Sequence, residues 1–179
     1  MQQKTHDINL KLSDIKQLFN SFDPSPFFER DLDDNAVEYI VDSVREFPKK
    51  KMRVVIHLPE LIAESIDPGD IKAAISNYFS YKEQYFIRKI MNQRQEGRNA
   101  LITGIAFLII CLSLSEFINA FIAGFLSRIL SEGLMIAGWV GMWKPISIFL
   151  YDWWPLENEK KVYGKIKSMD VKIRPIKLK

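Results

Sequence analysis

The chain has 179 residues, and its 25 Lys and Arg against 22 Asp and Glu give a formal net charge of only +3. This length allows one domain with an inserted element, or two small domains at most. The small net charge argues against a long nucleic acid as a partner. The one cysteine, Cys111, excludes a disulfide within the chain and a thiol cluster for zinc or iron–sulfur. Residues Met1–Leu12 lack the apolar core of a cleavable signal peptide, which predicts a cytoplasmic N-terminus.

The first part of the chain predicts one strand and one short helix. Apolar and polar residues alternate over His6–Leu12, which is typical of a strand with one buried face. Ser13 and Asp14 are suited to cap a helix over Ile15–Asn20. We expect that helix to bury Leu18, Phe19 and Phe22. The two prolines of Asp23–Pro26 then predict a turn.

The next segment predicts a helix and a central strand. Asp31 or Asp33 is a good N-cap for a helix that runs to about Phe47. Its buried stripe is predicted from apolar residues at helical spacing: Val37, Ile40, Val41 and Val44. The nearly continuous apolar run Arg53–Leu58 predicts a strand in the middle of a sheet.

A second long helix is predicted to lead into the apolar part of the chain. We expect Glu60–Ile66 to form a helical turn or a loop, and Asp67–Asp70 to form a turn in which Asp70 caps the next helix. Because no proline occurs between Ile71 and Lys144, this helix can continue without a break into the first apolar segment.

Residues 99–154 predict a helical hairpin in a lipid bilayer. The run Asn99–Ser115 has no charged residue, and together with Glu116–Ala120 it is long enough to cross the ~30 Å hydrocarbon layer. A second segment of similar character closes at Trp154. Lys and Arg mark the cytoplasmic side of membrane helices, and here they flank both ends of the hairpin: Arg88, Lys89, Arg94 and Arg98 before it, and Lys160, Lys161, Lys165 and Lys167 after it. We therefore expect both soluble arms in the cytoplasm, with the protein in the bacterial inner membrane.

The last segment is expected to complete the soluble domain. Pro155 is expected to end the membrane helix, and Glu157–Ser168 and Asp170–Ile173 predict a short helix and a strand. Neither arm has enough strands for a stable sheet alone, so the last strand should pair with the earlier ones. The predicted fold class is therefore α/β with an inserted transmembrane α-helical hairpin: residues 1–98 and 155–179 form the cytoplasmic domain, and residues 99–154 form the hairpin.

Charged residues inside the hairpin leave two interpretations open. If the second span starts at Gly133, Lys144 lies near the bilayer midplane; if it starts near Ile122, Lys144 lies at the cytoplasmic rim. A charge at the midplane is costly and would indicate a polar seam between protomers. The residues of such a seam would be Lys144, Glu116, Arg128 and Glu132. A further alternative places Phe117–Leu130 on the outer membrane surface as an amphipathic element.

Small and aromatic residues predict where the hairpin packs and where it meets the interface. A stripe of small residues allows close helix approach, either to the other span or to a second copy in a homo-oligomer: Gly133, Ala137, Gly138 and Gly141. Trp and Tyr collect at membrane interfaces, and the candidates are Trp139, Trp143, Tyr151, Trp153 and Trp154.

The soluble arms show no motif for catalysis. The acidic cluster of Asp31, Asp33 and Asp34 suits helix capping, with metal binding as the alternative. His57 lies between Ile56 and Leu58 in a predicted strand, where a partly exposed or satisfied histidine is expected. We therefore expect no catalytic residue, no metal and no cofactor, and a protein that is not an enzyme. The basic residues suit anionic lipid headgroups, or a small anionic ligand such as a nucleotide.

Two motifs carry a resemblance to a known family. The first is Asp23–Phe27 with Arg30–Asp33, and the second extends from Gly133 through Gly138–Pro145 to Leu150–Pro155. In these motifs the chain resembles a bacterial family of small two-span proteins of unassigned function. The resemblance implies a cytoplasmic domain with a hairpin and no catalytic residues. In layout, the chain is also similar to two-transmembrane effectors of anti-phage systems, whose cytoplasmic domain senses a cyclic nucleotide.

The sequence thus leads to two functional hypotheses. One is a membrane effector whose cytoplasmic domain senses a ligand, with a cyclic nucleotide as one candidate, and controls an oligomerising hairpin that perturbs the membrane. The other is a non-enzymatic anchor or scaffold for a partner protein, or a subunit of a larger envelope complex.

Overall fold

The structure is a computed structural model that describes residues 5–26 and 29–176. The chain divides into two compact units. An α/β unit comprises Met1–Phe86 and Asn158–Lys179, and a hairpin unit comprises Ile87–Glu157. Helices account for most of the chain, so the α/β character belongs to the first unit alone.

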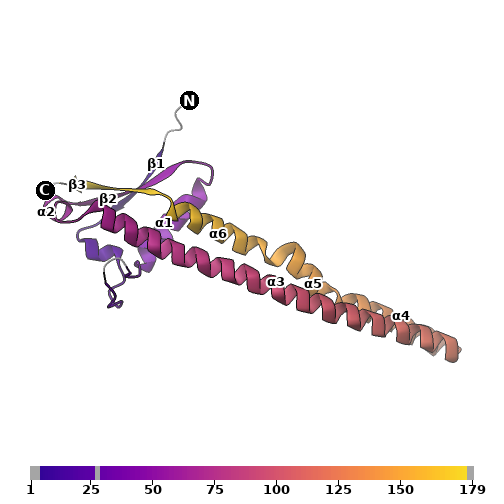
Figure 1. Ribbon diagram of the computed structural model, residues 1–179. Coiled ribbons are helices and arrows are strands. Elements are labelled where there is room, and N and C mark those ends of the chain that lie inside the picture. Colours follow the sequence, from indigo (N-terminus) through magenta and orange to yellow (C-terminus); the bar gives the residue numbers. More distant parts are fainter. Residues whose placement is uncertain (1–4, 27–28, 177–179) are drawn as a thin grey trace. The chain divides into compact units, whose positions relative to one another are not determined.

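Three parallel strands form the sheet of the α/β unit: β1 (His6–Lys11), β2 (Met52–Pro59) and β3 (Asp170–Ile176) (Figure 1). Their order is β1-β2-β3, so the strand from the C-terminal arm pairs with the central strand from the N-terminal arm. Ile8, Val54 and Val171 lie in register across the sheet, and all three belong to the hydrophobic core. The predicted strands, the central place of β2 and the pairing of the two arms are confirmed.

Helix α1 (Asp34–Glu46) connects β1 to β2 and packs its apolar stripe into the core. Asp33 caps it, because the Asp33 carboxylate accepts a hydrogen bond from the Asn35 backbone N–H at 3.0 Å. The predicted stripe is buried throughout: Val37, Ile40, Val41 and Val44. Asp33 therefore has the capping role that the sequence favoured.

Helix α3 (Pro68–Phe121) is one continuous helix, as the missing prolines predicted. Its first turns contribute Ile71, Ile75 and Phe79 to the core of the α/β unit. The predicted cap at Asp70 is wrong. Asp67 accepts a hydrogen bond from the Gly69 backbone N–H at 2.7 Å, and Pro68 takes the first helical position, where its fixed φ and missing N–H are tolerated.

Helix α6 (Trp154–Lys167) is anchored to the end of α1. The Lys165 ammonium donates to the backbone carbonyls of Phe47 at 3.3 Å and Pro48 at 2.9 Å, and burial lowers the pKa of Lys165. Pro155 was expected to end a membrane helix, but it lies in the first turn of α6, a position that proline tolerates.

The segment Glu60–Ile66 contains only the short helix α2 (Glu60–Ala63).

The segment between β1 and α1 departs from one expectation. The short 3-10 helix η1 (Ile15–Leu18) ends two residues before the expected boundary at Asn20. Leu18 and Phe19 are buried as predicted, whereas Phe22 is 93% exposed, because the chain has already left the helix at that point. The prediction for Phe22 is therefore wrong.

Asp23 organises the loop that leads to α1. One of its carboxylate oxygens accepts the Ser25 backbone N–H at 2.9 Å, and the other accepts the Asp31 backbone N–H at 2.6 Å. Hydrogen bonds from the Ser25 side chain and from these backbone groups lower the pKa of Asp23 from 3.8 to about 2. The charged carboxylate thus holds two points of the loop together.

We predict that the Asp23 carboxyl titrates near pH 2 in the full-length protein, and that Ser25→Ala moves the midpoint upward toward 3.8. Because the folded pKa is the lower one, the carboxylate stabilises the fold fully above about pH 4 and loses this contribution as the pH falls toward 2. Carbon-13 NMR of the side-chain carboxyl groups in detergent measures the midpoint. Equal midpoints in the wild type and in Ser25→Ala would contradict this account.

Candidate functional site in the helical hairpin

The hairpin unit consists of the second part of α3, a tight turn, and α4 (Phe125–Gly141). The turn includes Gly124, whose φ of 118° lies in the region that favours glycine. The second helix therefore begins at Phe125, close to the earlier of the two predicted starts. The interpretation of Phe117–Leu130 as one amphipathic element is wrong, because the turn divides it between α3 and α4.

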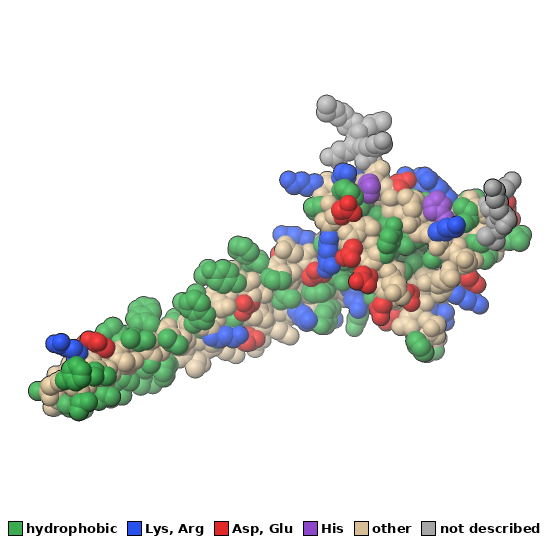
Figure 2. Space-filling model, turned by 180° about the vertical axis from the view of Figure 1, so that it is seen from behind, with side chains coloured by type: hydrophobic (Ala, Val, Ile, Leu, Met, Phe, Trp, Pro, Cys, Tyr) green, Lys and Arg blue, Asp and Glu red, His purple; other side chains and the backbone are tan. Residues whose placement is uncertain are grey.

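The outer surface of the hairpin is apolar. Two helical segments are long and apolar enough to cross a membrane: Pro68–Phe121 and Phe125–Lys167. The second segment is divided into α4 and the shorter helical elements that follow it. Only 17% of the most apolar window of each is buried, whereas the core helix of a soluble protein would be mostly buried. Figure 2 shows hydrophobic side chains over this surface and a few charged ones near the turn. Ile102, Ile136 and Trp143 are more than 60% exposed.

Two of the predicted small residues bring the helices of the hairpin together. A Cβ on Gly138 would lie 2.9 Å from Leu108 Cδ1 and 3.1 Å from Cys111 Cβ. A Cβ on Gly141 would lie 2.7 Å from the Phe107 ring. Cys111 is buried at this contact. Both glycines therefore serve the packing of α4 against α3 within one copy of the chain.

The other two members of the small-residue stripe face outward. A Cβ on Gly133 would have no neighbour within 4 Å, and Ala137 is exposed. These two positions are open on the surface of the hairpin.

A further close contact lies where α4 ends. Pro145 has no N–H to donate to the carbonyl of Gly141, four residues before it. That carbonyl oxygen lies 3.2 Å from the position that a Cβ on Gly104 would take. Gly104 thus lets the backbone of α3 approach the break in the second helix.

The sequence reasoning missed a polar network near the turn. Ser115 Oγ and Ser131 Oγ share a hydrogen bond of 2.7 Å, and Asn119 Nδ2 donates to Ser131 Oγ at 2.7 Å. The Ser127 hydroxyl lies 3.4 Å from the Ile118 carbonyl oxygen, to which it donates. Ser115, Ser127 and Ser131 are each at most 5% exposed. The pairs Ser115/Asn119 and Ser127/Ser131 each repeat after four residues, a signal that the sequence does contain.

The charged residues of the predicted seam lie at different positions along the length of the hairpin. Lys144 follows the start of α4 by roughly 28 Å of helix, and its ammonium lies 3.8 Å from the Glu96 carboxylate. The second helix thus has the earlier of the two predicted starts, and the depth of Lys144 in a bilayer stays a prediction. Glu116, Arg128 and Glu132 are exposed, and the described part of the chain places no oppositely charged group within ion-pair distance of them.

Aromatic residues surround the segment after α4. This segment consists of α5 (Trp143–Ser147) and the π-helical turn η2 (Ile148–Asp152), both in the hairpin unit. Four of the five predicted interfacial aromatics are exposed by more than half: Trp139, Trp143, Tyr151 and Trp154. Trp153 is half-buried, and its indole N–H donates to the Phe149 carbonyl at 3.0 Å.

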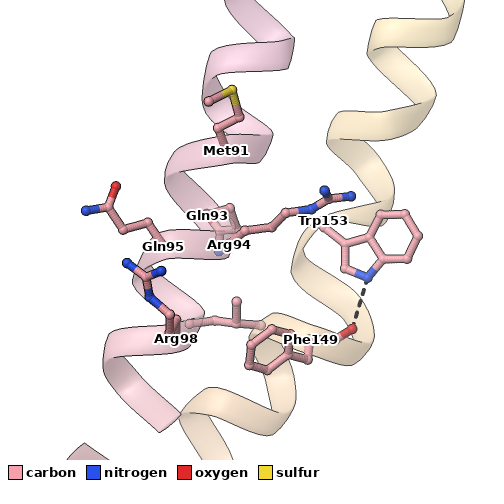
Figure 3. A pocket seen from close by; sticks show the side chains of 8 residues that line it. Met91, Gln93, Arg94, Gln95, Arg98, Phe149 and Trp153 are labelled. Atoms are coloured by element: carbon pink, nitrogen blue, oxygen red, sulfur yellow. Dashed lines mark hydrogen bonds between the residues drawn. The ribbon is translucent and has the colours of Figure 1, made fainter. Parts of the chain in front are cut away.

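A groove of about 670 Å³ lies between this segment and α3 (Figure 3). It is lined on α3 by Met91, Gln93, Arg94, Gln95 and Arg98, and on the other side by Ile148, Phe149 and Trp153. Arg94 extends from α3 toward the side of Trp153 (Figure 3). The groove thus combines a cationic wall with an apolar, aromatic wall.

The candidate residues of the α/β unit take structural places. The Asp31 backbone is held by Asp23, Asp33 caps α1, and Asp34 lies in the first turn of α1. His57 Nε2 lies 3.0 Å from Asn9 Oδ1 on the neighbouring strand. Within residues 5–26 and 29–176, no group of three His, Cys, Asp or Glu side chains is placed to hold a metal ion.

Comparisons of this chain with protein-family models, with curated proteins and with solved structures find no match.

We predict that Gly138→Leu destabilises the hairpin by about 1–3 kcal/mol, because the added side chain meets Leu108 and Cys111. Gly133→Leu is the matched control, since its side chain enters open space. All four tryptophans lie in the hairpin unit, so SDS titration of the protein in mild detergent, followed by tryptophan fluorescence, reports on this unit. Equal midpoints for the two variants would refute the assigned packing.

Ser131→Ala is predicted to cost about 0.6–2 kcal/mol in the same titration, because Ser115 and Asn119 lose their shared partner. Ser113→Ala serves as the control, since Ser113 is exposed on the same helix as Ser115. A loss that is equally large for Ser113→Ala would show that the network does not stabilise the hairpin.

Proposed function

We propose that this chain is a two-span protein of the bacterial inner membrane, with both arms in the cytoplasm, whose α/β domain senses a small anionic ligand and controls the membrane hairpin. In this proposal the hairpin perturbs the membrane when the domain changes state. The protein acts by binding and conformational change rather than by catalysis.

Placement in the membrane is supported by the apolar outer surface and by the charges that bound it. The helices expose large hydrophobic side chains over the length that a bilayer requires. Arg94 and Arg98 precede the apolar part of α3, and Lys160 and Lys161 follow the second helix. The connection at Ile122–Gly124 has Arg128 as its nearest basic residue, so the positive-inside rule assigns it to the outer side.

The observation that carries the proposal is the continuity of α3. The same helix buries Ile71 and Phe79 in the core of the sheet and contributes Cys111 and Ser115 to the hairpin. A ligand that alters the packing of the first turns of α3 therefore acts on the helix that forms the first span. Such direct connection is what a sensor that controls a membrane element requires.

The sheet offers a surface for an anionic ligand. The face of the sheet opposite the core is formed by the positions that alternate with the core residues. These positions include Arg53 and His57 on β2 and Lys172 and Arg174 on β3. Asp7 pairs with Arg53 at 2.7 Å and with Arg174 at 3.3 Å, and Asp170, in register with Arg53, pairs with Lys72 at 3.4 Å. On the three strands this face carries more basic than acidic side chains. This face is where the proposed nucleotide would bind. The layout is similar to that of cyclic-nucleotide effectors of anti-phage defence.

A second candidate function, a membrane anchor or scaffold, is favoured by the closed interior of the hairpin. The Ser and Asn side chains of the two helices pair with each other, and Gly138 and Gly141 pack against α3. The described residues of one copy therefore leave no unpaired Ser or Asn of this network between the two helices, and in this proposal an effector acts as an assembly of several copies. An anchor needs no such assembly.

We predict that induction of the full chain depolarises bacterial cells, measured with a potential-sensitive dye. The double variant Glu116→Gln/Arg128→Gln should reduce the depolarisation at least about tenfold at equal insertion, because an assembly of copies would use these charges to line a polar path. Ser113→Ala is the control.

An effector that needs its ligand would not depolarise cells when the chain is induced alone. The same measurement is therefore repeated with nucleotide synthases co-expressed, so that the candidate ligands are present. A correctly inserted chain that leaves the potential unchanged with and without these synthases would overturn the effector and favour the anchor.

A further inference from the structure

We propose that the groove between α3 and η2 binds an anionic phospholipid of the cytoplasmic leaflet, with the phosphate at Arg94 and Arg98 and the upper acyl chains along Phe149 and Ile148. The inference rests on the membrane placement within the proposed function, and it is independent of the effector role.

The two walls of the groove match the two parts of such a lipid. Arg94 and Arg98 provide guanidinium groups, which bind phosphate oxygens with paired hydrogen bonds. Arg94 extends toward Trp153, whereas Arg98 points to the other side of α3 and turns toward the phosphate in this proposal (Figure 3). Ile148, Phe149 and Trp153 provide the apolar wall on the other side. A free phosphate compound would use the first wall only, so the combination favours a lipid.

The two arginines have an uncompensated charge. In residues 5–26 and 29–176, no carboxylate lies within ion-pair distance of Arg94 or Arg98, and the nearby Glu96 pairs with Lys144 at 3.8 Å. Arg94 and Arg98 are four residues apart on one helix, a spacing at which like charges destabilise the helix. A bound phosphate removes this repulsion.

The apolar wall is held in place before any ligand arrives. A Cβ on Gly97 would lie 2.7 Å from Ile148 Cγ2 and 3.3 Å from Phe149 Cζ, so both side chains rest against the backbone of α3. The hydrogen bond from Trp153 Nε1 to the Phe149 carbonyl fixes the indole ring across the π-helical turn (Figure 3). A preformed wall reduces the entropy that binding costs.

The level and size of the groove also fit a lipid. Arg98 directly precedes Asn99, the first residue of the uncharged run, so the groove opens at the depth of the headgroup layer, which is roughly 5–7 Å thick on each side. Its volume of about 670 Å³ suits a headgroup and the first part of the acyl chains. The rest of the lipid remains in the bilayer.

The test is a lipid titration of the full chain in mild detergent, with bound molecules counted by native mass spectrometry. The probes are dioleoyl phosphatidylglycerol, dioleoyl phosphatidylcholine and glycerol 3-phosphate. The variants are Arg94→Gln, Arg98→Gln and Phe149→Ala, with Arg88→Gln as the matched control, since Arg88 lies on the same helix outside the groove. The SDS titration described above verifies that each variant retains a folded hairpin.

We expect one phosphatidylglycerol to bind more tightly than phosphatidylcholine, and each groove arginine to contribute about tenfold to its affinity. Phe149→Ala should weaken both lipids, and Arg88→Gln should weaken neither. Unchanged binding in Arg94→Gln and Arg98→Gln, or an equal loss in Arg88→Gln, would overturn the site. Displacement of the lipid by an equal concentration of glycerol 3-phosphate would overturn the lipid as the ligand.

The two proposals fail separately. A chain that binds phosphatidylglycerol through these arginines but leaves the membrane potential unchanged refutes the effector alone. A chain that depolarises cells without this lipid preference refutes the groove site alone.

Discussion

The close approach of α3 and α4 is the contact on which the topology depends. Gly138 and Gly141 let α4 lie against Leu108, Cys111 and Phe107, so the chain that leaves the α/β unit along α3 is turned back by α4. Only a returning chain can place β3 beside β2. Small residues suit this purpose because they let two helix backbones approach closely enough for dispersion to hold them.

Features that depend on local sequence could be predicted. Alternation in β1, helical spacing in α1, the Asp33 cap and the unbroken α3 all follow from residues within a few positions of each other. The pairing of β3 with β2 could be inferred because neither arm has enough strands alone. The apolar surface of the hairpin was visible in composition alone, since it depends on no partner within the chain.

Features that depend on contacts between distant segments could not be predicted with the same certainty. The start of the second helix is set by the turn at Gly124, and the apolar sequence on both sides of it gives no boundary. Gly138 and Gly133 look alike in sequence, yet only Gly138 meets α3. The groove needs residues more than 50 positions apart, Arg94 and Trp153 among them, and a charged helix beside an aromatic segment has no local signature. Ser115 and Asn119 meet Ser131 only once the turn has brought α3 and α4 into register, so their four-residue spacing alone does not indicate a network.

The order of the elements along the chain has a consequence for biosynthesis. β1, α1 and β2 are translated before the hairpin, but a two-stranded sheet is marginal and β3 follows both long apolar helices in the sequence. The sheet can therefore be completed only after the hairpin, with its exposed apolar surface, has been translated. If the hairpin inserts into a bilayer as proposed, the α/β unit can be finished only after both spans have been made, which links folding of that unit to membrane integration.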